Sequence, residues 1–182
     1  TGGDLSRFLN ELEWCGFIRK YTIIGKRSKD AIYQLIDNFT LFYFQFMQGN
    51  KNNDSHFWSN NIGSSLYRAW SGLAYERVCL QHISQIKASL GISGVLSNVY
   101  SWRTEGDENK GIDKTQIDLI IDRNDGVINL CEMKFSEQEY AITDDEEMKL
   151  RRRRGNFMEA TKTRKAVHIT LITPFGLKPN SH

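Results

Sequence analysis

The sequence has little cysteine, no long apolar run and almost no net charge. Its three cysteines, Cys15, Cys79 and Cys131, lie far apart and form no C-x-x-C spacing. This odd, scattered set argues against a disulfide framework and against a zinc knuckle, and it favours the reducing cytoplasm. The uncharged, aromatic-rich run over residues 38–50 is too short and too rich in Asn and Gln to span a bilayer, so we expect no membrane partner.

Composition also limits what the chain can be. The 182 residues carry a formal net charge of +2, which by itself is too small to indicate a nucleic-acid partner. Charge is instead polarised locally, because residues 144–147 read DDEE and residues 149–154 read KLRRRR. With 40% apolar and 25% charged residues, the composition is that of a folded protein with one ordinary domain or two small ones.

The first part of the chain predicts a partial winged helix. Apolar residues at helical spacing predict a helix over residues 4–15, with Asp4 as its N-cap and Gly16 as its stop. Strands are predicted over residues 17–24 and 31–36, joined by the polar turn GKRSKD. In a winged helix such a turn lies on the DNA backbone, although an unrelated helix and hairpin fits the pattern equally well. The basic residues of this turn are Lys26, Arg27 and Lys29.

The same turn does not form a phosphate-binding loop, because Lys20 stands where that motif needs a second glycine before Gly25. Residues 37–48 hold five aromatic side chains and predict a connecting helix. A polar run follows, so we place a domain boundary near residue 50, giving domains 1–50 and 51–182. The chain begins with Thr1 and a predicted helix follows almost at once, so we expect a fragment of a longer protein.

The second part of the chain predicts an α/β domain. A helix is predicted over residues 71–90, with a buried stripe of Leu73, Leu80, Ile83 and Leu90. Glu76 falls on that stripe, where a carboxylate is costly unless it is paired. After the helix come three strands, a helix and a strand, which is an α/β order. The predicted ranges are 98–103, 116–122 and 127–135 for the three strands, 144–161 for the helix, and 166–172 for the last strand.

The hairpin QIDLIIDRNDGVINLCEMKF is the best candidate for a site. Its three-residue loop NDG offers Gly126 for the left-handed position of a bulged turn. With that loop Asp118 lies opposite Glu132 and Gln116 lies opposite Lys134, all four on one face. Two directly opposed carboxylates repel each other, and a divalent cation between them would offset the repulsion. A two-residue loop would instead turn the two carboxylates to opposite faces.

Such a set suits metal-assisted phosphodiester hydrolysis. Mg²⁺ (or Mn²⁺) held by Asp118 and Glu132 would polarise a phosphoryl group and lower the pKa of a bound water. Lys134 would position or deprotonate that water and stabilise charge on the phosphate. Glu76, on the packed helix, would complete the metal shell or orient a metal-bound water.

An acidic residue on a helix, an aspartate on one strand and E-x-K on the next resembles the pattern of PD-(D/E)XK nucleases. By this resemblance Glu76 is the helical glutamate, Asp118 the aspartate, and Glu132 with Lys134 the E-x-K pair. Ile117 stands where the family name has proline. The resemblance implies a mixed sheet flanked by helices and a catalytic set of these four residues, although some members of the family bind without cutting.

A longer resemblance covers nearly the whole chain. The segments LNELEWCGFIRKY, GLAYERVCLQHISQIKASL, QIDLIID, INLCEMKFS and TKTRKAVHITLITPFG look like the C-terminal part of archaeal-type ATPases. These proteins have an AAA-like P-loop NTPase domain, a winged helix and a nuclease-like C-terminal domain. The resemblance implies that ATP would bind only to a domain upstream of this chain, and that DNA is the partner of the part present here.

Two sets of alternatives stay open. Arg151 and Arg154 share a helical face and would contact phosphate, or else the basic run pairs with DDEE as a salt-bridged, solvated helix. For the whole chain, the main hypothesis is a Mg²⁺-dependent deoxyribonuclease module of an ATPase. The alternatives are a noncatalytic DNA-binding or regulatory module, and an interaction surface for a partner protein.

Overall fold

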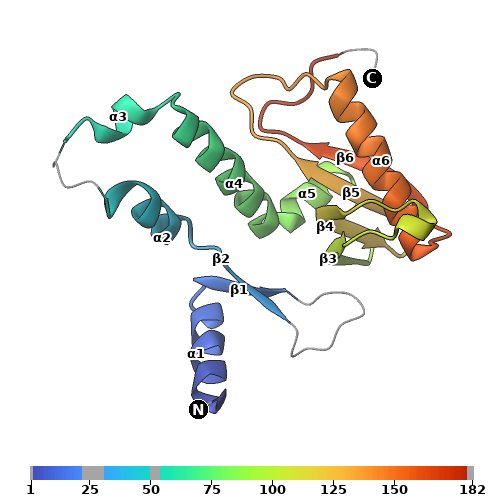
Figure 1. The fold of residues 1–182 in the computed structure, drawn as a ribbon, viewed down its shortest axis with the longest axis horizontal. Helices are drawn as coiled ribbons and strands as arrows, with labels where there is room; N and C mark the ends of the chain where they lie inside the picture. Colours follow the sequence, from blue (N-terminus) through green and yellow to red (C-terminus); the bar gives the residue numbers. More distant parts are fainter. Residues whose placement is uncertain (1, 22–30, 50–53, 180–182) are drawn as a thin grey trace. The chain divides into compact units, whose positions relative to one another are not determined.

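The computed structural model describes residues 2–21, 31–49 and 54–179 (Figure 1). It divides the chain into two compact units, residues 1–77 and residues 78–182, which we describe separately. The boundary predicted near residue 50 falls among residues 50–53, outside the described ranges, as does the predicted basic turn at 25–30. No helix in these ranges is both long enough and apolar enough to cross a membrane.

The first unit begins with a helix and a hairpin, as the sequence predicts. Helix α1 (Gly2–Trp14) is followed by the antiparallel strands β1 (Ile18–Tyr21) and β2 (Ile32–Leu35). The predicted stop is correct: Gly16 has φ +77°, and the Phe17 N–H donates to the Leu12 carbonyl at 3.0 Å. The helix begins before Asp4, which lies in its first turn and is not its N-cap.

The aromatic segment packs on itself in the first unit. Helix α2 (Asn38–Phe42) continues as a π-helical segment, η2 (Tyr43–Met47), and is followed by α3 (Phe57–Asn61). The centroid of the Trp58 ring lies 4.9 Å from that of Phe42 and 5.4 Å from that of Phe46, and both contacts are edge-on. These aromatic side chains therefore serve packing within this unit.

The long helix predicted over 71–90 is two helices. Helix α4 (Ser65–Gln81) ends where His82 adopts φ −118° and ψ 35°, and α5 (Ile83–Ser89) follows. The predicted buried stripe is misplaced, because Leu73 and Leu90 are exposed whereas Cys79 is buried. The break at His82 changes the rotational phase, so a stripe drawn through both helices does not follow one face.

The second unit is built on a four-stranded mixed sheet, which confirms the α/β prediction. Its strands are β3 (Ser97–Thr104), β4 (Thr115–Arg123), β5 (Val127–Met133) and β6 (Ala166–Ile172), in that spatial order. The pairs β3–β4 and β4–β5 are antiparallel, and β5–β6 is parallel. Helix α6 (Asp144–Thr161) forms the crossover from β5 to β6, and a 3-10 turn, η3 (Glu108–Lys110), lies between β3 and β4.

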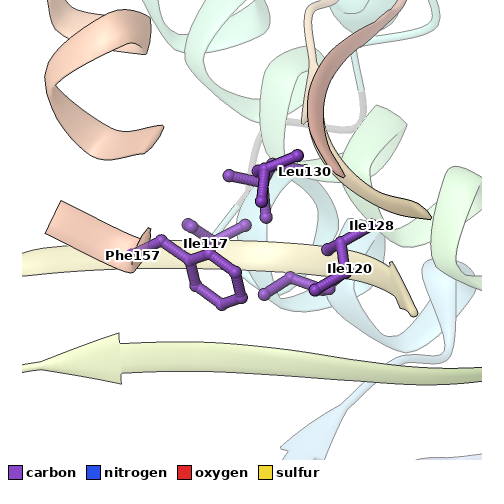
Figure 2. Packing of buried hydrophobic residues seen from close by; sticks show 6 residues of the cluster. Ile117, Ile120, Ile128, Leu130 and Phe157 are labelled. Atoms are coloured by element: carbon purple, nitrogen blue, oxygen red, sulfur yellow. The ribbon is translucent and has the colours of Figure 1, made fainter. Parts of the chain in front are cut away.

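Helix α6 covers one face of this sheet, which we call the α6 face. Phe157 is 2% exposed and lies against apolar side chains of β4, β5 and β6 (Figure 2). The Trp102 ring of β3 meets Phe157 edge-on at 5.3 Å. The Asn156 side chain donates to the Thr115 hydroxyl at 2.7 Å, so Thr115 also faces the helix. The packed cluster consists of Ile117, Ile120, Ile128, Leu130, Phe157 and Val167.

Candidate functional site

The β4–β5 hairpin has the loop and register that the sequence predicts. The loop is the three residues 124–126, and Gly126 has φ +86°. The pairs run from Leu119 with Cys131 to Asp122 with Ile128, so the residue numbers of each pair sum to 250. This register is the one in which Asp118 would follow opposite Glu132.

A β-bulge in β4 changes the face on which Asp118 lies. Ile120 pairs with Tyr100 and Ile117 pairs with Trp102, so β4 has one more residue than β3 between these pairs. Ile117 and Ile120 both belong to the cluster on the α6 face, although strict alternation would place them on opposite faces. The alternation of side chains is therefore interrupted at Asp118 and Leu119.

The two carboxylates consequently project from opposite faces of the sheet. Asp118 is next to Ile117, which faces α6, and it accepts a hydrogen bond at 2.6 Å from Gln116, two residues away on its own side. Glu132, in contrast, contacts Arg153 of α6. The prediction that Asp118, Glu132, Gln116 and Lys134 share one face is wrong, because it assumed uninterrupted alternation along β4.

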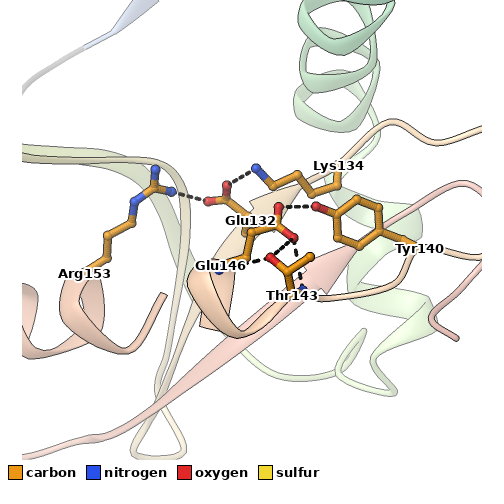
Figure 3. Close-up of polar contacts among 6 residues, drawn as sticks. All are labelled: Glu132, Lys134, Tyr140, Thr143, Glu146 and Arg153. Carbon is orange, nitrogen blue, oxygen red and sulfur yellow. Dashed lines mark hydrogen bonds and ion pairs between the residues drawn. The ribbon is translucent and has the colours of Figure 1, made fainter. Parts of the chain in front are cut away.

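Both oxygens of Glu132 are already paired with cations (Figure 3). The Lys134 Nζ lies 3.0 Å from Oε1, and the Arg153 Nη1 lies 2.6 Å from Oε2. The Glu132 side chain is only 19% exposed, so this arrangement compensates a largely desolvated carboxylate. The E-x-K pair of the sequence is thus brought together, but as an ion pair that also includes Arg153.

A second carboxylate lies beside this ion pair. The Tyr140 hydroxyl donates a hydrogen bond to the Glu146 carboxylate, which also forms a capping box with Thr143 at the start of α6. Burial opposes ionisation of Glu146, but hydrogen bonds from Tyr140 and from the Thr143 backbone, together with the charge of Lys134, bring its pKa below the ordinary value. Burial and the Glu146 carboxylate raise the pKa of Tyr140.

The cavity among these side chains is small. It has a volume of about 40 Å³ and is lined by charged side chains, among them Glu132, Lys134 and Arg153, and by the apolar side chains of Ile142, Leu150 and Leu171. A site of this size holds one or a few water molecules and has no room for a nucleotide. Any phosphate would therefore contact only its open side.

The residues present do not fit a divalent cation. Mg²⁺ takes one or two free carboxylates together with waters. Asp118 projects from the other face, and Glu132 is held by Lys134 and Arg153. Among the described residues, no three His, Cys, Asp or Glu side chains form a group that could hold a metal ion.

The remaining predicted residues have different outcomes. Glu76 lies half-buried on α4 in the first unit, whereas the hairpin belongs to the second. Lys26, Arg27 and Lys29 fall outside the described residues. Arg151 pairs with Glu147 at 2.5 Å, as the salt-bridged interpretation of the basic run expects. Arg154 is exposed, and no ion pair to it is found among the described residues.

Sequence reasoning missed the side chains that complete this cluster. The spacing T-x-x-E at Thr143 and Glu146 is a capping-box pattern that was available in the sequence. No sequence signal marks Arg153, because its contact with Glu132 joins residues 21 positions apart. Tyr140 lies in a loop without periodicity, so its position depends on the fold.

Comparison with protein-family models, with curated proteins and with solved structures finds no match for this chain.

Proposed function

We propose that this chain is a noncatalytic DNA-binding module of an archaeal-type ATPase, with a nuclease-like second unit. The observation that carries the proposal is the state of Glu132, whose two oxygens are held by Lys134 and Arg153 while Asp118 projects from the opposite face. A nuclease of this pattern needs both carboxylates free to share one metal. Here the acidic half of the site is neutralised by the protein itself.

The first unit supports DNA as the ligand. Its helix α1 and the hairpin β1–β2 follow in the order expected for the closing half of a winged helix. In that arrangement the connection between the two strands carries the phosphate contacts, and here it includes Lys26, Arg27 and Lys29. Contacts of this kind position the protein on the backbone without reading bases. The link to an upstream ATP-binding domain follows from the sequence resemblance alone.

The proposal is tested by fluorescence anisotropy with a labelled duplex over a range of salt concentrations. We expect DNA binding that EDTA does not change and that Asp118→Ala and Glu132→Ala do not weaken. Replacing Lys26, Arg27 and Lys29 together by Ala should weaken binding and reduce the salt slope by up to about three units. The matched control is Lys114→Ala, a basic residue that pairs with Glu105 in the second unit, which should leave the slope unchanged. Binding that requires Mg²⁺, or that persists in the triple variant, would contradict the proposal.

A metal-dependent deoxyribonuclease remains the second candidate. The β4–β5 register is the predicted one, and Glu132 and Lys134 lie together as E-x-K residues do in that family. For this function Arg153 would have to release Glu132, and the Asp118 side chain would have to reach the other face. Nicking of supercoiled plasmid with Mg²⁺ or Mn²⁺, abolished by both Asp118→Ala and Lys134→Ala, would support this candidate over the first.

A further inference from the structure

Strand β6 is an edge of the four-stranded sheet and has one side of its backbone unused. The Ala166 N–H donates to the Gly126 carbonyl, and the Ile172 carbonyl accepts from the Lys134 N–H, both at 2.9 Å. Even-numbered residues of β6 therefore direct their backbone groups towards β5. Since these directions alternate, Val167, Ile169 and Leu171 direct theirs outward. Within the described residues no hydrogen bond reaches these outward groups.

This edge lacks the features that prevent strand pairing. Over its length β6 pairs with β5 without a bulge, and its sequence AVHITLI contains neither proline nor a lysine, arginine or carboxylate. Edge strands of monomeric proteins are usually protected by such features. The opposite edge strand, β3, differs because it carries Arg103 and a register shift against β4. Of the two edges, β6 is the one suited to adding a strand.

An open groove runs between this edge and α6. Its volume is about 620 Å³, and Leu150 and Met158 of α6 line it together with Ile169 and Leu171 of β6. An added strand would satisfy the backbone of β6 but would leave the apolar side of α6 in water. An occupant that carries both a strand and a helix covers both.

The charges beside the groove are arranged so that they would complement a second copy of the chain. Because β5 and β6 are parallel, the crossover helix α6 runs antiparallel to β6. Its acidic first turn, residues 144–147, therefore lies towards the end of β6, and basic residues lie towards its start. A two-fold axis through Ile169 would place the acidic end of each copy beside the basic end of the other. Of the basic residues there, Lys162 pairs with Glu159 and Lys165 with Asp122, so among the described residues Arg154 and Arg164 carry the basic charge that faces the partner copy.

We propose that two copies of this chain pair antiparallel through β6, joining their sheets into one and packing the two α6 helices across the junction. An acidic peptide would complement only the basic end of the edge. In the dimer, the acidic end of each copy complements the basic end of the other. The interface does not involve the residues proposed to bind DNA, so the two proposals stand or fall separately.

The test is sedimentation velocity of the full chain as a function of concentration. We expect a monomer–dimer equilibrium that Ile169→Pro abolishes, because the Ile169 N–H points outward and its loss breaks no bond within the sheet. His168→Ala, at a neighbouring position whose backbone groups bond β5, is the control and should still dimerise. Circular dichroism and thermal melting check that both variants are folded. A wild-type chain that stays monomeric at about 100 μM (Kd far above the micromolar range) would overturn the proposal.

A charge exchange tests the interface without altering the strand. Arg154→Glu should weaken the dimer by about tenfold or more, since the substitution occurs twice in a two-fold interface. Adding Glu147→Arg in the same chain should restore dimerisation. If the double variant is no more dimeric than Arg154→Glu, the antiparallel arrangement is wrong. If substitution of Lys26, Arg27 and Lys29 by Ala dissociates the dimer, these residues are involved in dimerisation and the β6 interface is wrong.

Discussion

At the scale of single residues, Glu132 shows how the protein compensates a carboxylate that is largely removed from water. Its exposed fraction is 19%, and two cations from different elements, Lys134 on the hairpin and Arg153 on α6, hold its two oxygens. Removing one partner of such a group leaves a charge without full compensation. The same pairing keeps Glu132 from acting as a free metal ligand.

We expect Arg153→Ala to lower the free energy of unfolding by about 1 kcal/mol, because Arg153 is itself 43% exposed and solvent screens part of the interaction. The matched control is Arg151→Ala, whose pair with Glu147 lies on the exposed side of the helix and should contribute about 0.5 kcal/mol or less. Urea unfolding followed by circular dichroism measures both. Equal effects of the two substitutions would show that the partial burial of Glu132 does not matter.

At the scale of elements, the contact between α6 and the sheet depends on one aromatic side chain. Phe157 is 2% exposed and touches residues of β4, β5 and β6. We expect Phe157→Ala to lower the free energy of unfolding by about 3–5 kcal/mol through lost burial and the cavity left behind. The control is Met158→Ala, at the next position and 37% exposed, which should lower the free energy of unfolding by much less. Denaturant titration of both variants distinguishes them.

Glu146, at the start of α6, makes the stability of the folded protein depend on pH. The pKa of Glu146 is lowered in the folded state from an ordinary value of 4.5 by hydrogen bonds from Tyr140 and Thr143 that outweigh its burial. A lowered pKa contributes stability that is present above about pH 4.5 and is lost as the pH falls through the folded value. Glu146 lies in the first turn of α6, where the positive end of the helix dipole also stabilises its ionised carboxylate.

We therefore expect Glu146→Gln to destabilise the protein more at pH 6.5 than at pH 3.5. Tyr140→Phe should reduce this pH dependence, because it removes the hydroxyl that stabilises the ionised form. Urea unfolding of the three proteins across this range gives the result. A difference between wild type and Glu146→Gln that grows as the pH falls would contradict the assigned direction of the shift.

At the scale of the whole molecule, the two functional proposals assign different tasks to different parts of the chain. The first unit would contact DNA through its hairpin, and the second would join two copies through β6. The small cavity beside Glu132 belongs to neither task. The molecule thus has no need of a bound metal for either proposed role.

From this we expect millimolar Mg²⁺ to leave the thermal unfolding midpoint unchanged. A ligand that binds only the folded state at about 100 times its Kd would stabilise it by about 2.7 kcal/mol, which a melting experiment detects readily. The same melting experiment on Arg153→Ala is the comparison. This substitution frees one Glu132 oxygen from its cation, so it tests whether that ion pair is what keeps Mg²⁺ from binding. A clear upward shift in the wild-type protein would favour the nuclease hypothesis instead.

The sequence by itself determined the local features of this protein. Segments rich in β-branched residues marked β4 and β5, and the loop with Gly126 determined their register. The helix predicted over residues 144–161 is α6, with the same bounds. The α/β class followed from the order of helices and strands along the chain.

Only the tertiary structure decided where the functional side chains point. The bulge that turns Asp118 away from Glu132 exists in the pairing of β4 with β3, and no residue type within IDLII marks it. The pairing of Arg153 with Glu132 required α6 to be packed on the sheet through Phe157. Turn chemistry and periodicity act between near neighbours in the chain, whereas the facing of a side chain and the neutralisation of a charge depend on elements that folding brings together.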